Sequence, residues 1–227
     1  MTIHDRPQNS DNSGGQEAQA ASVGRETLWA ENVKVLSCNT AYQGFFRVDS
    51  YCLQYRLYNG GWSAKLKREL FERGHAVAVL LYDPHRDSLV FIQQFRIGAL
   101  AVGWDPWLLE VVAGIIENGE TAEQVVRREV LEEAGCTVTT LERVGHYLVS
   151  PGASTETVEL FCGKVDSVHI GGIHGCLSEG EDIRVLVLPA KKSLNMLAQG
   201  AFNNGAILMV MLWFALHRDR LRREWQK

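Results

Sequence analysis

The stretch from Gly114 to Cys136 limits what this chain can fold into more than any other part of it. Its sequence, GIIENGETAEQVVRREVLEEAGC, places a glycine-bearing loop before a segment rich in helix-forming residues. Thr121 and Gln124 have the spacing of a capping box at a helix N-terminus. Gly135 stands where a helix ends in a left-handed cap. We therefore expect a loop that leads into a short helix, followed by extended chain from residue 136 to residue 140.

The expected helix carries two carboxylates on its apolar side. At about 100° per residue, Glu129 and Glu133 lie within the same arc as Val126 and Val130. Two like charges one turn apart on a core-facing surface repel each other and lose solvation. A hard divalent cation that takes carboxylate oxygens would resolve this conflict, whereas acids on a solvated surface helix would need no ion. Periodicity alone leaves both interpretations open.

The spacing within this stretch resembles a known signature. Gly114, five residues, Glu120, seven residues and then Arg128-Glu-Val-Leu-Glu-Glu-Ala-Gly135 is similar to the Nudix hydrolase box at every fixed position. Cys136 alone departs from it, at a position that is usually aliphatic, and a small apolar thiol can pack there without touching the chemistry. The resemblance implies the α/β class, with a Nudix α/β/α sandwich and a small N-terminal antiparallel β domain.

Composition narrows the function classes. The chain has 227 residues, of which 46% are hydrophobic, and a formal net charge of −4. That charge argues against nucleic-acid binding, which requires a basic surface. The most apolar run, 206–216, is too short to span a membrane. No signal peptide pattern is visible, and the five scattered cysteines contain no CxxC pair, so we expect reduced thiols in a cytoplasmic protein. They are Cys38, Cys52, Cys136, Cys162 and Cys176.

The chain divides into three expected regions. Residues 1–24 are polar and low in large apolar side chains, so we expect a disordered tail. Residues 25–72 form an expected N-terminal β domain. Residues 28–57 alternate and are rich in aromatic residues, with a turn at 59–61, and predict a small antiparallel sheet of two or three strands that is marginal alone. Residues 73–227 form the expected Nudix domain. We expect its strands at 75–82, 88–95, 107–113, 144–149, 157–165 and 183–188, and two closing helices at 190–199 and 203–225.

Similarity to one branch of the family extends beyond the box. Segments 71–75, 94–97, 106–110, 150–152 and 171–184 resemble the bacterial ADP-ribose pyrophosphatases. Pro151, fifteen positions after the box, matches the proline placement that separates this branch from other Nudix enzymes. The resemblance implies hydrolysis of ADP-ribose to AMP and ribose 5-phosphate. It also implies two or three Mg²⁺ ions per site, with Mn²⁺ able to substitute, and a homodimer that exchanges its N-terminal sheets.

Two other functions are weighed against this one. A related Nudix enzyme could act on another nucleoside diphosphate sugar, such as GDP-mannose, and the sequence does not rank guanine firmly against adenine. A non-catalytic ADP-ribose sensor on the same fold is the third hypothesis. Sensors commonly lose the metal-binding acids, whereas here the run from Arg128 to Glu133 is intact.

The resemblance also implies roles for individual residues. Glu129 and Glu133 correspond to catalytic, metal-binding carboxylates, with Glu132 as a further metal ligand or support and Ala113 as a backbone carbonyl ligand. Glu179 corresponds to the general base in a glycine-bearing loop, and Glu181 to a further metal ligand. The acids of that loop could instead form only a solvated turn, and Glu181 is the alternative base. The expected substrate-binding residues are Arg96, Phe45, Arg68, Glu110, Gly114 and Pro151.

Several of these residues have plainer explanations. Arg96 could be a surface arginine, and Phe45, expected from the partner chain with Arg68 around the adenine, could belong to a core. Glu120 and Arg128 are expected to pair and fix the loop to the helix. His75, His146 and His174 are expected to be structural histidines.

Overall fold

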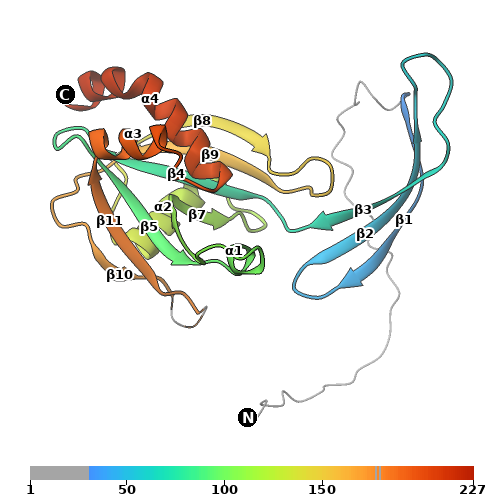
Figure 1. The fold of residues 1–227 in the computed structure, drawn as a ribbon, viewed down its shortest axis with the longest axis horizontal. Coiled ribbons are helices and arrows are strands. Elements are labelled where there is room, and N and C mark those ends of the chain that lie inside the picture. Colours follow the sequence, from blue (N-terminus) through green and yellow to red (C-terminus); the bar gives the residue numbers. More distant parts are fainter. Residues whose placement is uncertain (1–30, 177, 179) are drawn as a thin grey trace, which may run out of the picture.

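The computed structural model describes residues 31–176, 178 and 180–227. It contains a small three-stranded sheet and a larger mixed sheet with helices on both faces (Figure 1). The predicted tail at 1–24, the first residues of the predicted N-terminal region and Glu179 lie outside the described residues.

The small sheet is antiparallel and consists of β1 (Val33–Gln43), β2 (Arg47–Tyr55) and β3 (Leu66–Glu72), in that order. It extends to one side of the larger sheet, and β3 leads into that sheet through residues 73–75 (Figure 1). Every residue of β1 is exposed. The sequence pattern predicted a sheet of two or three strands without bounds for a third strand, and β3 is that third strand.

The larger sheet has the order β10-β11-β5-β4-β9-β8, with β6 paired to β5 and β7 paired to β4. Its central pair, β4 and β9, is parallel, and the other pairs are antiparallel. The strands are β4 (Ala76–Asp83), β5 (Ser88–Phe95), β6 (Trp107–Glu110), β7 (Val112–Ile115), β8 (Thr140–Leu148), β9 (Thr157–Lys164), β10 (Gly172–His174) and β11 (Ile183–Pro189).

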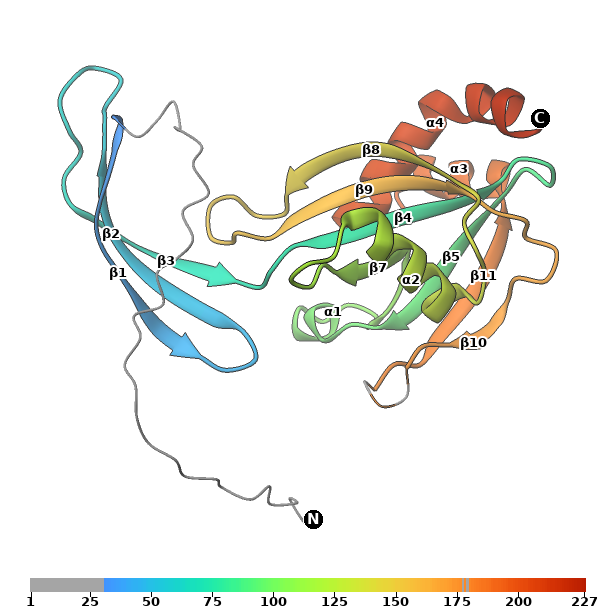
Figure 2. The ribbon, with the colours of Figure 1, turned by 180° about the vertical axis from the view of Figure 1, so that it is seen from behind.

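Helices cover the two faces of this sheet. Helix α2 (Ala122–Ala134) lies on one face, and α3 (Ala190–Ala198) and α4 (Gly205–Trp225) lie on the other (Figure 2). Alternate residues of β4 divide between two hydrophobic clusters, because successive side chains in a strand point to opposite faces. Val77 and Val79 contact the α2 side, whereas Leu80 and Tyr82 contact the side of α3 and α4. The predicted α/β/α sandwich is confirmed.

The ends of α2 follow the sequence prediction. The Thr121 backbone N–H donates to Gln124 Oε1 at 2.9 Å, and the Gln124 N–H donates to Thr121 Oγ1 at 3.4 Å. Gly135 has φ +62°, the left-handed conformation that closes the helix. The segment after it begins strand β8 only at Thr140, so the extended chain expected at 136–140 is largely a connection.

The prediction of a single strand at 107–113 is wrong in one respect. This segment forms two strands, because β6 pairs with β5 and β7 pairs with β4, and the chain changes partner at Val111. A largely apolar run does not report its pairing partners, and Glu110, the last residue of β6, is the only polar residue of the run. The short helix α1 (Ile97–Ala101) and the strand β10 were also not expected.

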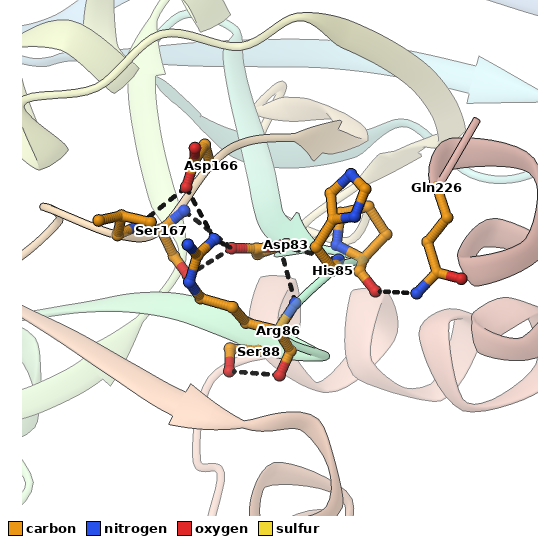
Figure 3. Close-up of polar contacts among 9 residues, drawn as sticks. Asp83, His85, Arg86, Ser88, Asp166, Ser167 and Gln226 are labelled. Carbon is orange, nitrogen blue, oxygen red and sulfur yellow. Dashed lines mark hydrogen bonds and ion pairs between the residues drawn. The ribbon is translucent and has the colours of Figure 1, made fainter.

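The turn between β4 and β5 is fixed by a buried carboxylate. Asp83 is fully buried and accepts hydrogen bonds from the backbone N–H groups of His85, Arg86 and Ser167, and from the Arg86 and Ser167 side chains (Figure 3). Burial opposes ionisation of Asp83, but these donors outweigh it and hold its pKa well below the ordinary value. The Gln226 side chain, just after α4, also contacts this turn, because its amide N–H donates to the Pro84 carbonyl at 2.8 Å.

None of the helices within the described ranges has the length and apolar character needed to cross a membrane. The apolar run at 206–216 lies in α4, where Val210 and Phe214 are buried and Leu216 is exposed.

Candidate active site

The two acids that the helical period placed among apolar residues do face the sheet. Glu133 is 3% exposed, and its Oε2 accepts a hydrogen bond from the Ala113 N–H on β7 at 3.1 Å. Glu129 lies one turn earlier with its carboxylate against Gly114. The glycine loop and the helix therefore meet at these two carboxylates.

Gly114 is required here for space. A Cβ atom built on Gly114 would overlap the carboxyl group of Glu129. Any larger residue at position 114 would displace that carboxylate or the loop. This contact gives the first glycine of the box a physical reason, since its backbone conformation does not require a glycine.

Both acids have strongly altered affinities for protons. Burial raises the pKa of Glu129 to about 7, the Arg128 charge opposes the rise, and the Glu132 and Glu181 charges add to it. Burial raises the pKa of Glu133 to about 8, where the Ala113 N–H opposes the rise and the charges of Glu129 and Glu181 add to it. Low solvation and like charge are the features that a divalent cation would offset.

Arg128 connects the loop to the helix, as predicted. Its Nε lies 3.3 Å from Glu120 Oε1, and its Nη1 lies 2.8 Å from Glu129 Oε1 and 3.3 Å from Glu132 Oε2. Glu120 in turn accepts the Glu117 backbone N–H at 3.1 Å, which closes the loop on itself. Arg128 thus restrains both the loop and one face of the acid cluster.

The segment between β10 and β11 supplies another acid. Glu181 Oε2 accepts the Cys176 backbone N–H at 3.0 Å. Glu181 packs against Gly175, whose backbone N–H donates to the Glu132 carbonyl of α2 at 3.2 Å, so Glu181 lies near the helix that carries Glu129 and Glu133. Glu179, the expected general base, lies outside the described residues.

The oxygen ligands offered by these acids suit a hard cation, but the acids do not converge on one point in this structure. The oxygens of Glu129, Glu133 and Glu181 each accept a bond from the protein, namely from Arg128, the Ala113 N–H and the Cys176 N–H. Within the described ranges, no group of three or more His, Cys, Asp or Glu side chains converges as a metal site. Carboxylate and carbonyl oxygens are nevertheless the ligands that Mg²⁺ and Mn²⁺ prefer.

Arg96 and Glu110 form an ion pair beside these acids. Arg96 Nε lies 2.8 Å from Glu110 Oε2, and the Arg96 charge opposes the rise that burial causes in the pKa of Glu133. Burial raises the pKa of Glu110, with Arg96 and Gln94 opposing the rise. Arg96 is therefore a cation held at the edge of the acid cluster, with part of its side chain exposed.

Gln94 is a buried polar residue of this region that the sequence prediction missed. It follows Val90 and Ile92 on the face of β5 that points towards α2. Its amide nitrogen has no partner of normal hydrogen-bond geometry in the described part of the chain, although the amide lies near Glu110. The sequence could have indicated it, because Gln94 is the polar residue in a series of alternate positions that is otherwise apolar.

Three predicted substrate-binding residues lie away from the acids. Phe45 is 89% exposed in the turn between β1 and β2, and Arg68 is exposed on β3. Pro151 is exposed in the turn between β8 and β9, where Ala153 accepts the Phe71 N–H at 2.8 Å. Phe45, Phe46 and Phe71 form successive edge-to-face contacts, so the small sheet and this turn meet through Phe71. Within the described residues, no hydrogen bond or ion pair joins Phe45, Arg68 or Pro151 to Glu129 or Glu133.

The chain is similar to proteins of known activity over most of its length. It is 42% identical over 199 residues to the ADP-ribose pyrophosphatase of Escherichia coli (strain K12), covering 88% of this chain and 95% of that protein. The ADP-ribose pyrophosphatase of Haemophilus influenzae is 37% identical over 200 residues, covering 87% and 92%. The GDP-mannose pyrophosphatase of Cronobacter sakazakii is 34% identical over 146 residues, covering 64% and 75%.

Structural similarity and the family comparison point the same way. A crystal structure titled as an ADP compounds hydrolase superposes with a TM-score of 0.61 at 19% identity, covering 81% of this chain and 95% of the other, which shows the shared fold. The NUDIX domain model matches residues 72–187, which include the box, Arg96, Pro151 and Glu181. From the fold, the site and this match, we conclude that the chain belongs to the Nudix family.

Proposed function

We propose that this Nudix hydrolase cleaves the diphosphate of ADP-ribose, giving AMP and ribose 5-phosphate, in a reaction that depends on Mg²⁺. The observation that carries the proposal is the 42% identity to an ADP-ribose pyrophosphatase over 88% of the chain. The inward-facing pair Glu129 and Glu133 supports it, because these carboxylates are intact and poorly solvated.

The residues that would hold two or three cations are Glu129, Glu132, Glu133, Glu181 and the carbonyl of Ala113. When bound, Mg²⁺ supplies charge neutralisation for the diphosphate and a nucleophilic water at neutral pH. To hold a cation, Glu129, Glu133 and Glu181 would release their present donors, which are Arg128, the Ala113 N–H and the Cys176 N–H. Mn²⁺ takes the same oxygen ligands and is expected to substitute.

Arg96 would orient the diphosphate. Its guanidinium is held by Glu110 at 2.8 Å, which fixes its direction while leaving part of the side chain accessible. Glu179 would accept the proton of the attacking water, with Glu181 as the alternative base. Gly114 would permit close approach of the loop backbone to the substrate.

The remaining substrate contacts would require a second copy of the chain. We propose a homodimer in which residues 25–72 form an exchanged β domain and residues 73–227 form the hydrolase domain. The fully exposed β1 strand supports this, because an unpartnered small sheet is marginal in water. Phe45 of the partner subunit and Arg68 would then hold the adenine, and Pro151 would border the same junction.

GDP-mannose is the second candidate substrate. The identity of 34% to a GDP-mannose pyrophosphatase favours keeping it, although that similarity covers 64% of this chain rather than 88%. A sensor without catalysis is disfavoured because the box acids are complete. The five cysteines of the described residues are free, which supports the proposed cytoplasmic location.

A substrate panel tests the proposal. Purified protein with Mg²⁺ is incubated with ADP-ribose, GDP-mannose, ADP-glucose and NADH, and mononucleotide release is followed. ADP-ribose is expected to give the highest kcat/KM, with no release in excess EDTA. A higher kcat/KM for GDP-mannose would replace the proposed substrate, and the absence of release from all four would exclude this class of reaction.

A further inference from the structure

Strand β10 is attached to the last turn of α2. The Gly175 backbone N–H, directly after β10, donates to the Glu132 carbonyl at 3.2 Å. Strand β10 is only three residues long and lies at the edge of the sheet beside β11 (Figure 2). The end of β10 is therefore held both by its pairing with β11 and by this bond to the helix.

His174 is the side chain at this attachment. Its ring occupies the space above Gly135, where a Cβ atom would overlap ring atom Cε1. Its Nε2 lies 2.8 Å from the Gly171 carbonyl, and since a carbonyl only accepts, Nε2 must be the protonated nitrogen. A glycine is thus needed at position 135 for two reasons. Its φ is +62° at the helix end, and a side chain there would overlap the His174 ring.

The residues directly after His174 hold Glu181. Gly175 has φ +98°, and a Cβ atom there would lie 2.8 Å from Glu181 Cβ, so the close approach needs a glycine. The Cys176 N–H donates to Glu181 Oε2 at 3.0 Å, and the Glu181 N–H donates to the Cys176 carbonyl at 3.2 Å. The carboxylate of Glu181 is therefore fixed relative to residues 175 and 176, which in turn follow the His174 attachment.

These contacts form one continuous path from the box helix to the loop acid. We propose that His174 is a positioning residue, which holds Gly175 and Cys176 against the end of α2 at Gly135 and thereby sets the position of Glu181 relative to Glu129 and Glu133. The inference rests on the proposed function for the role of Glu181 as a cation ligand. In this proposal His174 acts through Glu181 and is not itself a ligand.

The test measures metal binding without substrate. Binding of Mn²⁺ to the full chain is followed by electron paramagnetic resonance for the wild type, His174→Ala, Glu181→Gln and the double variant. His174→Ala is expected to weaken Mn²⁺ binding by about 10- to 100-fold, the usual effect of losing a group that orients a ligand. If His174 acts through Glu181, the double variant should bind Mn²⁺ no more weakly than Glu181→Gln alone.

Amide hydrogen exchange gives a second readout that involves no metal. Peptides containing Cys176 and Glu181 should exchange faster in His174→Ala, while α4 peptides keep the wild-type rate. His174→Gln retains a side-chain N–H for the Gly171 carbonyl and is expected to restore much of the Mn²⁺ affinity. His146→Ala, which removes an exposed histidine of β8, is the matched control and should leave both readouts unchanged.

Specific results would overturn the proposal. They are wild-type Mn²⁺ affinity and exchange in His174→Ala, additive losses in the double variant, or unchanged Mn²⁺ affinity in Glu181→Gln. If His174→Ala does not fold, His174→Asn replaces it in the same cycle. A wild-type protein that leaves ADP-ribose intact would refute the proposed substrate, yet the Mn²⁺ and exchange results would still decide the role of His174.

Discussion

The carboxyl group of Glu129 occupies the space that a Cβ atom on Gly114 would fill. Gly114→Ala should therefore displace this carboxylate and lower kcat/KM by about 10- to 100-fold, as expected when a ligand loses its orientation. Steady-state kinetics with a Mg²⁺ titration measures the effect. Gly145→Ala is the control, because a Cβ there meets nothing within 4 Å. Equal kinetics for the two variants would show that the contact does not matter.

Glu133→Gln should abolish most turnover. The substitution removes the buried carboxylate that we propose as a cation ligand, and we expect kcat to fall by several orders of magnitude. Calorimetric Mg²⁺ titration should show weaker binding, with a circular dichroism spectrum like that of the wild type. Glu123→Gln, on the exposed side of α2, is the matched control. Near-normal activity with unchanged Mg²⁺ dependence in Glu133→Gln would refute the assignment.

The same acids predict a pH dependence of stability in metal-free protein. Their pKa values of about 7 and about 8 lie above the ordinary value of 4.5. Between these limits the folded chain binds more protons than the unfolded chain, so the free energy of unfolding should decrease as pH rises. Urea unfolding in EDTA at pH 5 and pH 8 measures the difference. Glu133→Gln should reduce it, whereas an unchanged slope in the variant would contradict the raised pKa.

The exchanged dimer predicts complementation between two inactive variants. Phe45→Ala keeps the acids and Glu133→Gln keeps Phe45, so a mixed dimer would contain one complete site. After subunit exchange, an equal mixture should recover about a quarter of wild-type activity, since half the dimers are mixed and each has one good site of two. Sedimentation should show a homodimer at micromolar concentration. A fully active monomer, or a mixture without recovery, would contradict the arrangement.

Asp83 provides a prediction about stability alone. Asp83→Asn removes the charge that accepts five hydrogen bonds at the β4–β5 turn and should cost about 3 kcal/mol of unfolding free energy. Because the folded pKa is lowered, this contribution is present above the ordinary pKa of 3.8 and is lost as pH falls towards the folded value. Urea unfolding measures it, and kcat should stay unchanged. A loss of kcat without destabilisation would be the contrary result.

The sequence predicted those features that depend on local spacing. The capping residues Thr121 and Gln124, the left-handed Gly135 and the inward direction of Glu129 and Glu133 all follow from helical geometry and turn chemistry. The Arg128–Glu120 pair follows from the box in the same way. Each of these is decided within some twenty residues of chain.

Features that depend on distant partners were not predictable in this way. The break at Val111 arises because β6 pairs with β5, whereas β7 pairs with β4. The contact of the His174 ring with Gly135 brings together residues that are far apart in the sequence, and no local sequence pattern indicates that they are neighbours. The place of Phe45, exposed in the turn between β1 and β2, is likewise not set by any local pattern.

The alternation along β4 has a practical consequence for redesign. Val77 and Val79 contact the same cluster as α2, whereas Leu80 and Tyr82 contact α3 and α4. The sheet therefore separates the layer that bears the candidate chemistry from the layer that bears much of the apolar volume. Thermostabilising substitutions among buried α4 residues such as Val210 and Phe214 could be selected for melting temperature alone, and their catalytic side effects should be small.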